Sequence, residues 1–404
     1  MTEWPSYRLE DVVTRVAMGP FGSSIKVSTY VESGVPVING QQLKTGKVSD
    51  AGFNFITEAH ADKLKKANAG PGNIVVTHRG TLGQVAMVPR DCRFPRYVVS
   101  QSQFLIECDE TKLMPEFLTY FLRSPRGQYL LLANANQTGV PSIAQPVTYI
   151  RGIEVAVPPL PEQRAIAEVL GALDDKIESN RRVGWLLESW MRREFEARFN
   201  VEPGTGSVSI PKLLDVNPKR SLKKSEAAPY LGMSSMPTQS ALATEWELKA
   251  AGSGQRFING DVLMARITPC LENGKIALVD FLEDDQVGWG STEYIVFRSK
   301  DPMPLEWAYC LARSDPFTGY AVRHMNGSSG RQRCPASAFD EYKIESPDPV
   351  SVKEFGEMAM PAFKRMSAAR DENRSLAQLR DTLLPALLSG RIRIPAAAEL
   401  VEAS

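Results

Sequence analysis

The sequence predicts an α+β protein made of two similar, mostly β globular domains, each followed by a long α-helix. Three observations support this fold class. A series of motifs occurs twice in the same order, each copy contains short apolar runs bounded by Gly, Asn or Pro, and each copy ends in a long segment with helical periodicity. At 404 residues the chain is too long for one hydrophobic core, which agrees with two domains or more.

The duplication appears as matching motifs at a nearly constant separation. The matched pairs are Leu9-x-Asp11-Val12 with Leu213-x-Asp215-Val216, Gly72 to Arg79 with Gly260 to Ile267, Gly83 to Val88 with Gly274 to Val279, Ser102 to Ile106 with Thr292 to Val296, and Asn180-Arg181 with Asn373-Arg374. After the first pair the separation stays between 188 and 193 residues. A chance series would not keep this order, so the chain is internally duplicated.

The first copy contains four predicted strands: Val35–Ile38, Ile74–Thr77, Val85–Val88 and Phe104–Glu107. A helix is predicted from about Pro115 to Arg123, with a counterpart from about Leu305 to Arg313. Proline-rich junctions then end each globular part, because proline continues neither a strand ladder nor a helix interior. The predicted globular domains are residues 1–158 and 201–348.

A long helix is predicted after each junction, over residues 159–200 and 349–390, with a flexible tail at 391–404. Seam positions of the first helix alternate in spacings of four and three; they are Ile166, Leu170, Leu173, Ile177, Asn180, Gly184, Leu187 and Met191. The second helix places Phe363, Met366, Ala369, Asn373, Leu376, Leu379, Leu383 and Leu387 on one side. This pattern predicts a coiled coil with a polar seam position, and Pro361 and Pro385 are expected to kink or limit the second helix. The alternative is that each helix packs only on its own domain.

Composition restricts the functional class. Forty-seven basic and 47 acidic residues give zero net charge, whereas a protein that binds DNA alone usually has a basic excess. Either the positive charge is clustered on one face, or partner subunits supply phosphate contacts. Five scattered cysteines without a C-x-x-C pair argue against a zinc site and a disulfide framework. No signal peptide or membrane span is evident, so a cytoplasmic protein is expected.

The motifs together resemble the specificity subunit of Type I restriction–modification enzymes. The resemblance covers nearly all of residues 4–393 and includes Gly19-Pro-Phe-Gly-Ser23, Arg79-Gly-Thr-Leu-Gly83, Pro158-Pro-Leu-Pro-Glu-Gln163 and Leu383-Leu-Pro-Ala-Leu-Leu-Ser-Gly390. The second half has no equivalent of Pro158 to Gln163 beyond Ser346-Pro-Asp-Pro349. The two helices are therefore not expected to dock partners identically.

The resemblance implies that each globular domain reads one half of a split, asymmetric DNA target. It implies that the helices pair antiparallel as a spacer, dock two methyltransferase subunits, and join an assembly with restriction (motor-nuclease) subunits. Methyl donor, ATP and magnesium are then expected on the partners, with no cofactor in this chain. The expected partner contacts are Glu162, Gln163, Arg164, Asn180, Asn373 and Leu383. At ~1.5 Å per residue the proline-free stretch from Glu162 to Phe199 would span about 57 Å as a helix, so half-sites about one duplex turn or more apart are expected.

Enzyme motifs are missing, which predicts a non-catalytic chain. No [DN]-P-P-[YF] motif for adenine methylation occurs, and Gly40 to Val48 has the wrong spacing for a phosphate loop. Asp215 with Glu247 and Lys249 could form a metal-dependent nuclease trio, but such triplets are common surface charges. The rival functional class is a duplicated coiled-coil scaffold that organises partners without reading DNA.

The candidate DNA-binding residues lie on loops, where arginine suits guanine or phosphate and glutamine suits adenine. They are Ser23, Lys26, His78, Arg79, Gln137, Thr138, Ser142, Arg266, Ser328, Ser329, Arg331, Gln332 and Arg333. The alternative for Ser23 and Lys26 is an ordinary turn, and the loops Asn136 to Ser142 and Asn326 to Arg333 could instead pack structurally against the helix starts. No metal site is predicted.

Overall fold

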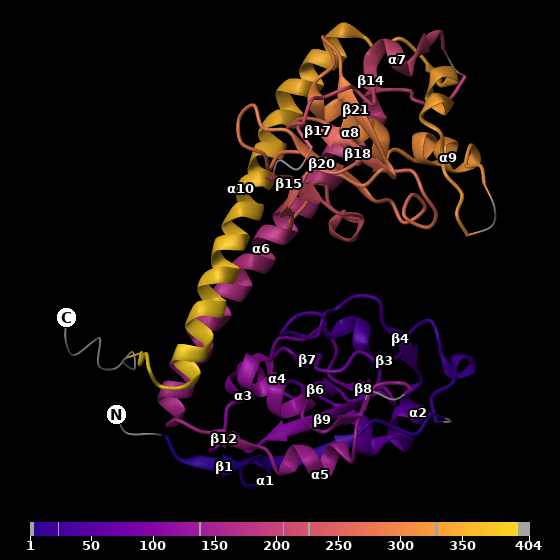
Figure 1. The fold of residues 1–404 in the computed structure, drawn as a ribbon. Helices are drawn as coiled ribbons and strands as arrows, with labels where there is room; N and C mark the ends of the chain where they lie inside the picture. The colour runs from indigo at the N-terminus through magenta and orange to yellow at the C-terminus, as the bar shows by residue number, and fades with distance from the viewer. Residues whose placement is uncertain are drawn as a thin grey trace. The chain divides into compact units, whose positions relative to one another are not determined.

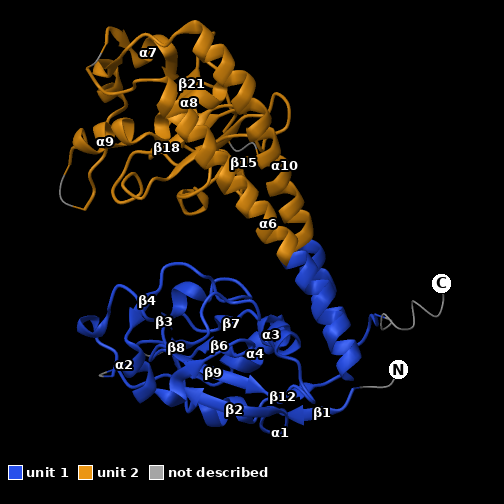
Figure 2. Cartoon of the chain, turned by 180° about the vertical axis from the view of Figure 1, so that it is seen from behind, with its two compact units in different colours: residues 1–174, 378–404 blue, residues 175–377 orange. Residues whose placement is uncertain are grey.

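The computed structural model describes residues 4–22, 24–136, 139–204, 206–224, 227–327 and 330–394. It divides into two compact units, coloured separately in Figure 2: unit 1, residues 1–174 and 378–404, and unit 2, residues 175–377. Each predicted globular domain lies within one unit, and each long helix contributes residues to both.

Unit 1 contains two four-stranded sheets. The first has the strand order β2-β9-β6-β7, formed by β2 (Val13–Met18), β9 (Gln103–Cys108), β6 (Ile74–Thr77) and β7 (Val85–Met87). The second has the order β4-β3-β8-β5, formed by β4 (Asn54–Ile56), β3 (Val35–Ile38), β8 (Tyr97–Val99) and β5 (Asn68–Ala69). All neighbouring pairs are antiparallel except β3 with β8.

Strands β6, β7 and β9 of the first sheet are buried on both faces, which explains their uninterrupted apolar runs. Ile74 and Val76 of β6 belong to a core shared with α3 (Pro115–Arg123) and α4 (Pro125–Leu132). Val75, which points to the opposite face, belongs to a second core shared with the other sheet. Unit 1 therefore has three layers, helices, sheet and sheet (Figure 1).

Unit 2 repeats this topology, which confirms the duplication. Its sheets have the orders β14-β21-β18-β19 and β16-β15-β20-β17, again with one parallel pair, β15 with β20. The strands are β14 (Leu214–Val216), β21 (Tyr294–Ser299), β18 (Val262–Ala265), β19 (Ile276–Leu278), β16 (Glu247–Ala250), β15 (Ala227–Leu231), β20 (Gly288–Gly290) and β17 (Arg256–Phe257). Helix α8 (Leu305–Arg313) covers the first sheet, as α3 does in unit 1. The predicted helices Pro115–Arg123 and Leu305–Arg313 are confirmed.

Shorter elements close each unit. Unit 1 also has β1 (Ser6–Arg8) paired with β12 (Glu154–Ala156), β10 (Ala135–Asn136) paired with β11 (Ser142–Ile143), and helices α1 (Leu9–Val12), α2 (Glu58–Lys63) and α5 (Pro146–Arg151). Unit 2 has β13 (Val208–Ser209) paired with β22 (Lys343–Ile344), and helices α7 (Ile210–Leu213) and α9 (Asp315–Arg323). In each unit the first strand of the globular domain pairs with its last strand, so the two ends of the domain lie together where the long helix begins.

The two long helices are α6 (Leu160–Arg198) and α10 (Pro349–Leu388), and they pack together antiparallel. In unit 2, Asn180 donates to the side-chain oxygen of Asn373 (3.0 Å), and Arg198 pairs with Glu354 (3.1 Å). In unit 1, Asp174 pairs with Arg380 (2.7 Å). The predicted polar seam position is confirmed, because Asn180 is 2% exposed and its partner is the matching Asn of the other helix.

One detail of the helix prediction was wrong. Leu379 is 47% exposed, whereas Leu384 is buried in the unit 1 core, so the seam of α10 shifts to Leu384. The helix runs from Pro349 through Pro361 and ends at Leu388, shortly after Pro385. A proline removes one backbone donor and disturbs the preceding turn, and here the packing of neighbours such as Phe363 and Leu387 offsets that cost.

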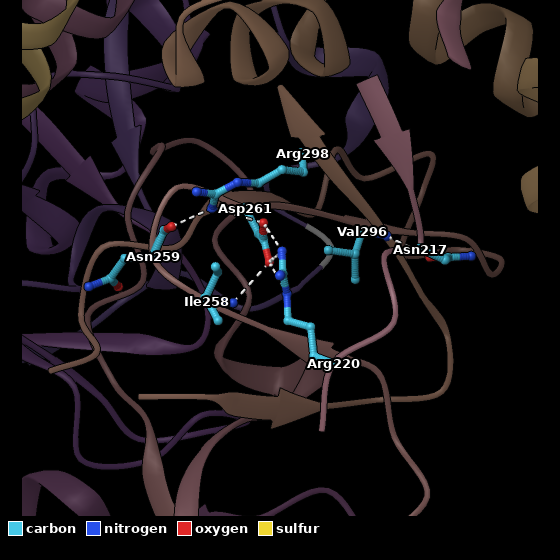
Figure 3. A network of polar contacts seen from close by, with 7 residues as sticks. All are labelled: Asn217, Arg220, Ile258, Asn259, Asp261, Val296 and Arg298. Carbon is cyan, nitrogen blue, oxygen red and sulfur yellow. Dashed lines mark hydrogen bonds and ion pairs between the residues drawn. The ribbon is translucent and has the colours of Figure 1, made fainter. Parts of the chain in front are cut away.

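A buried carboxylate holds part of unit 2 together. Asp261, just before β18, is 0% exposed and accepts three hydrogen bonds from Arg220 (2.6, 2.6 and 3.0 Å) and one from Arg298 (3.2 Å) (Figure 3). It also accepts from the backbone N–H of Ile258 (2.9 Å). The matching position in unit 1 is Asn73, which accepts from the backbone N–H of Gly70. Both units thus have a hydrogen bond from a backbone N–H to the side chain three residues later, whereas the ion pairs occur in unit 2.

No helix within the described residues is both long and apolar enough to cross a membrane.

Candidate nucleic-acid interface

The candidate loops of unit 1 gather at one end of its first sheet. Strand β6 ends at Thr77 opposite Gln103, where β9 begins, and β2 ends at Met18 opposite Phe104. The segments that start at Gly19 and at His78 therefore leave the sheet at the same end. The backbone N–H of Gly19 donates to the Gln103 carbonyl oxygen (2.8 Å).

Glycine at position 19 allows this approach. A Cβ atom at Gly19 would lie 1.9 Å from the carbonyl oxygen of Ser100, so a side chain cannot fit there. The loop Gly19–Gly22 is thereby held against the turn that precedes β9, and the side chain of Phe21 on this loop is 90% exposed.

A third segment joins the same end of unit 1. The backbone of Ile143 donates to the His78 carbonyl oxygen (2.9 Å), and Gly80 donates to the Pro141 carbonyl oxygen (2.9 Å). Arg79 and Ser142 form an isolated bridge between these segments. The structure therefore brings together two of the expected DNA-binding residues of unit 1, an exposed Arg79 and a partly exposed Ser142.

His78 has a structural position. It is 8% exposed, and its Nε2 atom lies 3.1 Å from the Gln101 carbonyl oxygen. Burial lowers the pKa of the imidazole below its usual 6.5. A neutral ring then donates to Gln101 and fixes the turn beside Arg79, so the side chain of His78 is not available to DNA.

The corresponding end of unit 2 contains a cluster of three charged residues. Arg266 directly follows β18, and its backbone N–H donates to the carbonyl oxygen of Glu293, the residue before β21 (3.0 Å). The backbone of Arg333 forms a β-bridge with Ile267, the residue after Arg266. The Arg333 guanidinium donates from Nε to both carboxylate oxygens of Glu293 (2.8 and 2.9 Å), and its Nη2 forms an ion pair with the same carboxylate (2.8 Å). These hydrogen bonds raise the pKa of Arg333 above its ordinary value. The Arg266 guanidinium lies 3.9 Å from the same carboxylate.

The other expected residues are distributed as follows. Arg331 is exposed beside this cluster, and the backbone carbonyl of Gln332 accepts from the Thr268 N–H (3.1 Å). Lys26 is exposed at the start of a short 3-10 turn, Val27–Thr29. Five expected residues lie outside the described part of the chain: Ser23, Gln137, Thr138, Ser328 and Ser329.

The backbone contacts also correct the sequence alignment of the two halves. His78 donates to the Ser102 carbonyl oxygen just as Arg266 donates to that of Glu293, so Ser102 corresponds to Glu293 rather than to Thr292. The direction of the side chains supports this correspondence, because Leu105 and Val296 both point toward the second sheet of their unit. The separation in this motif is 191 residues rather than 190.

Sequence reasoning missed Glu293 and Phe21. Glu293 was treated only as part of a repeat, although a carboxylate directly before a buried strand is a signal for a specific partner. Phe21 was passed over because it lies between glycines in a turn, and its exposure depends on how the loop lies on the turn before β9.

The expected partner-binding residues of α6 and α10 differ in availability. Gln163 is 0% exposed and forms hydrogen bonds with three backbone groups. Glu162 is largely buried, and its carboxylate lies 3.8 Å from the Arg393 guanidinium. Asn180 and Asn373 pair with each other, and Leu383 packs on the unit 1 core. Arg164 is exposed. Gln163 is therefore not available to a partner, because all of its amide atoms are used inside unit 1.

Comparison with known proteins relates this arrangement to one family. Residues 1–184 match the family model described as Type I restriction modification DNA specificity domain. The Type I restriction enzyme EcoEI specificity subunit of Escherichia coli is 29% identical over 160 residues, which make up 38% of this chain and 27% of that protein. The match thus spans about a quarter of the length of this relative. The HindI specificity subunit of Haemophilus influenzae is 20% identical over 474 residues, covering 97% of this chain and 100% of the relative.

The fold has a counterpart among solved structures. The crystal structure of the Type I restriction–modification system S subunit from M. genitalium superposes with a TM-score of 0.59 at 15% identity, covering 95% of this chain and 96% of that one. The fold class predicted from the sequence and the resemblance to specificity subunits are therefore confirmed.

Proposed function

We propose that this chain, which carries a Type I restriction modification DNA specificity domain in residues 1–184, is the DNA-recognition subunit of a Type I restriction–modification enzyme. In this role it reads a split, asymmetric target in double-stranded DNA and directs methyltransferase and restriction subunits to it. The proposal extends to the whole chain what the family model supports for its first half.

One observation carries the proposal. The two units present loops at the same end of the same kind of sheet, but with different side chains. Arg79 and Ser142 meet there in unit 1, and Arg266 and Arg333 meet there in unit 2. A shared scaffold with different hydrogen-bonding groups is what two readers of different base sequences need. The asymmetry of the target follows from this difference.

The chain supplies recognition, and its partners supply the chemistry. The sequence has no motif that would bind a methyl donor or nucleotide, so methyl transfer and DNA translocation require other subunits. We propose that methyl donor, ATP and magnesium bind to those subunits, and that the complex acts in the cytoplasm.

The surface for methyltransferase subunits is proposed on the long helices. In unit 2, α6 exposes the large apolar side chains Trp185 (59%), Leu186 (49%) and Trp190 (41%). Leu186 and Trp190 are four residues apart and lie on the same side of the helix. Exposed aromatic residues of this size are enriched where partner proteins bind. The alternative function, a scaffold that does not read DNA, also needs such a surface but is not favoured by the family match.

The proposal is tested by mapping methylated adenines in the genome of a host that expresses this chain together with the methyltransferase subunits of the same system. We expect one split, asymmetric motif with a fixed run of unread bases. Arg79→Ala should change or weaken only one half of the motif, by about 1–3 kcal/mol if the arginine reads a base. A palindromic or continuous wild-type motif would contradict the two-reader proposal.

Two controls separate reading from assembly. The double variant Trp185→Ala and Trp190→Ala should abolish methylation while the purified chain still binds DNA, because only partner docking is lost. The purified chain alone should incorporate no label from a labelled methyl donor. Robust transfer by the chain alone would show that it is an enzyme.

A further inference from the structure

The surface of unit 2 contains a carboxylate where DNA phosphates would repel a negative charge. Glu293 lies between Arg266 and Arg333, at the sheet end assigned above to DNA contact, and its side chain is 23% exposed. An acidic side chain at such a surface weakens DNA binding unless it has a specific role. Its geometry with Arg333 indicates what that role is.

Glu293 occupies only one edge of the Arg333 guanidinium. Nε donates to both carboxylate oxygens and Nη2 forms an ion pair with one of them, so the carboxylate lies along the side of the group. Among the described residues, the end of the group, formed by Nη1 and Nη2, makes one further contact, a long 3.5 Å hydrogen bond from Nη1 to the Arg331 carbonyl oxygen. Because the Arg333 side chain is 40% exposed, this end is accessible from solvent.

An arginine held in this way has two parallel N–H groups at its free end. Two acceptors with matching spacing occur on guanine, at O6 and N7 in the major groove, and bidentate contact with them is the commonest specific arginine contact in DNA recognition. Holding the guanidinium in advance reduces the rotamer entropy that is lost on binding. The adjacent Arg266 leaves the cluster with a net positive charge, which balances the repulsion between Glu293 and phosphates.

Unit 1 lacks this arrangement at the matching positions. Ser142 corresponds to Arg333, since each bridges an Asn on the same hairpin, and Ser102 corresponds to Glu293. His78 stands in place of Arg266 and is buried. The guanidinium–carboxylate pair is therefore a property of unit 2 alone.

We infer that Arg333 is a guanine-binding residue of the second half-site and that Glu293 is the positioning residue that holds it end-on toward the base. The inference rests on the proposed function and adds to it the identity of one base and the pair of side chains that reads it. The half-site read by unit 2 then contains a guanine whose recognition requires both residues.

The test compares methylated adenines mapped in a host genome for the wild-type complex and for variants of this chain. Arg333→Ala and Glu293→Gln should both relax the same guanine position, reducing its preference over other bases by about tenfold or more. The half-site read by unit 1 should stay unchanged in both. The control Glu283→Gln removes the same charge from an exposed position after β19 and should leave the whole motif unchanged.

One more variant distinguishes the effect of the charge of Glu293 from the effect of its size. Gln has the size of Glu but no charge, whereas Asp keeps the charge in a smaller side chain. Glu293→Asp should therefore retain more of the guanine preference than Glu293→Gln, whereas a purely packing role predicts the reverse order. The thermal unfolding midpoint of each variant, measured on the full chain, shows whether unit 2 is still folded.

Several results would overturn the inference. These are a motif without guanine in the half-site that Arg333→Ala changes, an unchanged motif for Glu293→Gln, or Gln retaining more preference than Asp. Each of them leaves the split target, and thus the proposed function, in place. A wild-type complex that methylates no split motif would overturn both.

Discussion

The side chain of Gln163 is expected to be one of the most important single contributors to the stability of unit 1. Its Oε1 accepts from the backbone N–H of Met114 (2.7 Å), and its Nε2 donates to the carbonyl oxygens of Lys112 and Pro158 (both 2.8 Å). The residue is 0% exposed. It thereby connects the start of α6 to the segment before α3 and to the junction before the helix.

Gln163→Leu keeps most of the side-chain volume but removes all three hydrogen bonds. Each lost bond costs about 0.5–1.5 kcal/mol, and a buried group left without a partner costs about 1–3 kcal/mol. Since one donor and two acceptors lose their partner, we expect unit 1 to lose about 3–5 kcal/mol in its free energy of unfolding. The exposed neighbour Arg164 provides the control, because Arg164→Leu should change stability by less than about 0.5 kcal/mol.

Hydrogen exchange measured by mass spectrometry suits this test, because a chain with two units need not unfold in one step. The amide of Met114 should exchange roughly a thousandfold faster in Gln163→Leu, as expected for a loss of about 4 kcal/mol. Peptides of unit 2 should exchange as in wild type. A loss below about 1 kcal/mol in unit 1 would refute the argument that these three bonds fix the helix start.

Three further predictions concern buried polar groups. Asp261→Asn should destabilise unit 2 by about 3 kcal/mol in urea unfolding, because Arg220 and Arg298 lose their carboxylate; an unchanged midpoint would contradict this. Since the pKa of His78 is lowered by burial, unit 1 should lose stability as pH falls below about 6.5, where the unfolded chain binds the additional proton; His78→Gln should remove that part of the pH dependence of thermal unfolding. Asn180→Leu should destabilise unit 2 by about 1 kcal/mol, whereas adding Asn373→Leu should restore or exceed wild-type stability, because two apolar seam residues leave no unpaired amide; equal effects of the single and double variants would argue against the pairing.

Much of the fold could be predicted because local patterns and tertiary packing agree. Ile74–Thr77 and Pro115–Arg123 have the predicted bounds, since apolar runs and a proline at the helix start indicate the same structure at both levels. Leu379 shows the limit. A leucine at a seam-like spacing was expected to be buried, but the choice between Leu379 and Leu384 depends on the packing of the unit 1 core.

The candidate site could be located from the sequence but not resolved into roles. Arg79, Arg266 and Arg333 were identified as loop residues, and the structure shows which contacts each makes. His78 could not be distinguished from Arg79, because only the tertiary structure shows which of two adjacent side chains is buried. Glu293 was misaligned by one residue, and a slip of one residue in a strand exchanges its two faces. The pairing of Glu293 with Arg333 was thus beyond sequence reasoning.

The division of the chain into units has a consequence for the order in which the protein forms during synthesis. Unit 2 is continuous in sequence, whereas the unit 1 core joins Ile166 and Leu170 of α6 with Leu384 and Leu387 of α10. The ribosome must therefore add about 200 residues between the two parts of that core. At about 5–20 residues per second this takes about 10–40 s, during which Ile166 and Leu170 lack the part of the core that Leu384 and Leu387 supply. The domain that is synthesised first is thus the last to be completed, and this interval is when a chaperone would have most to protect.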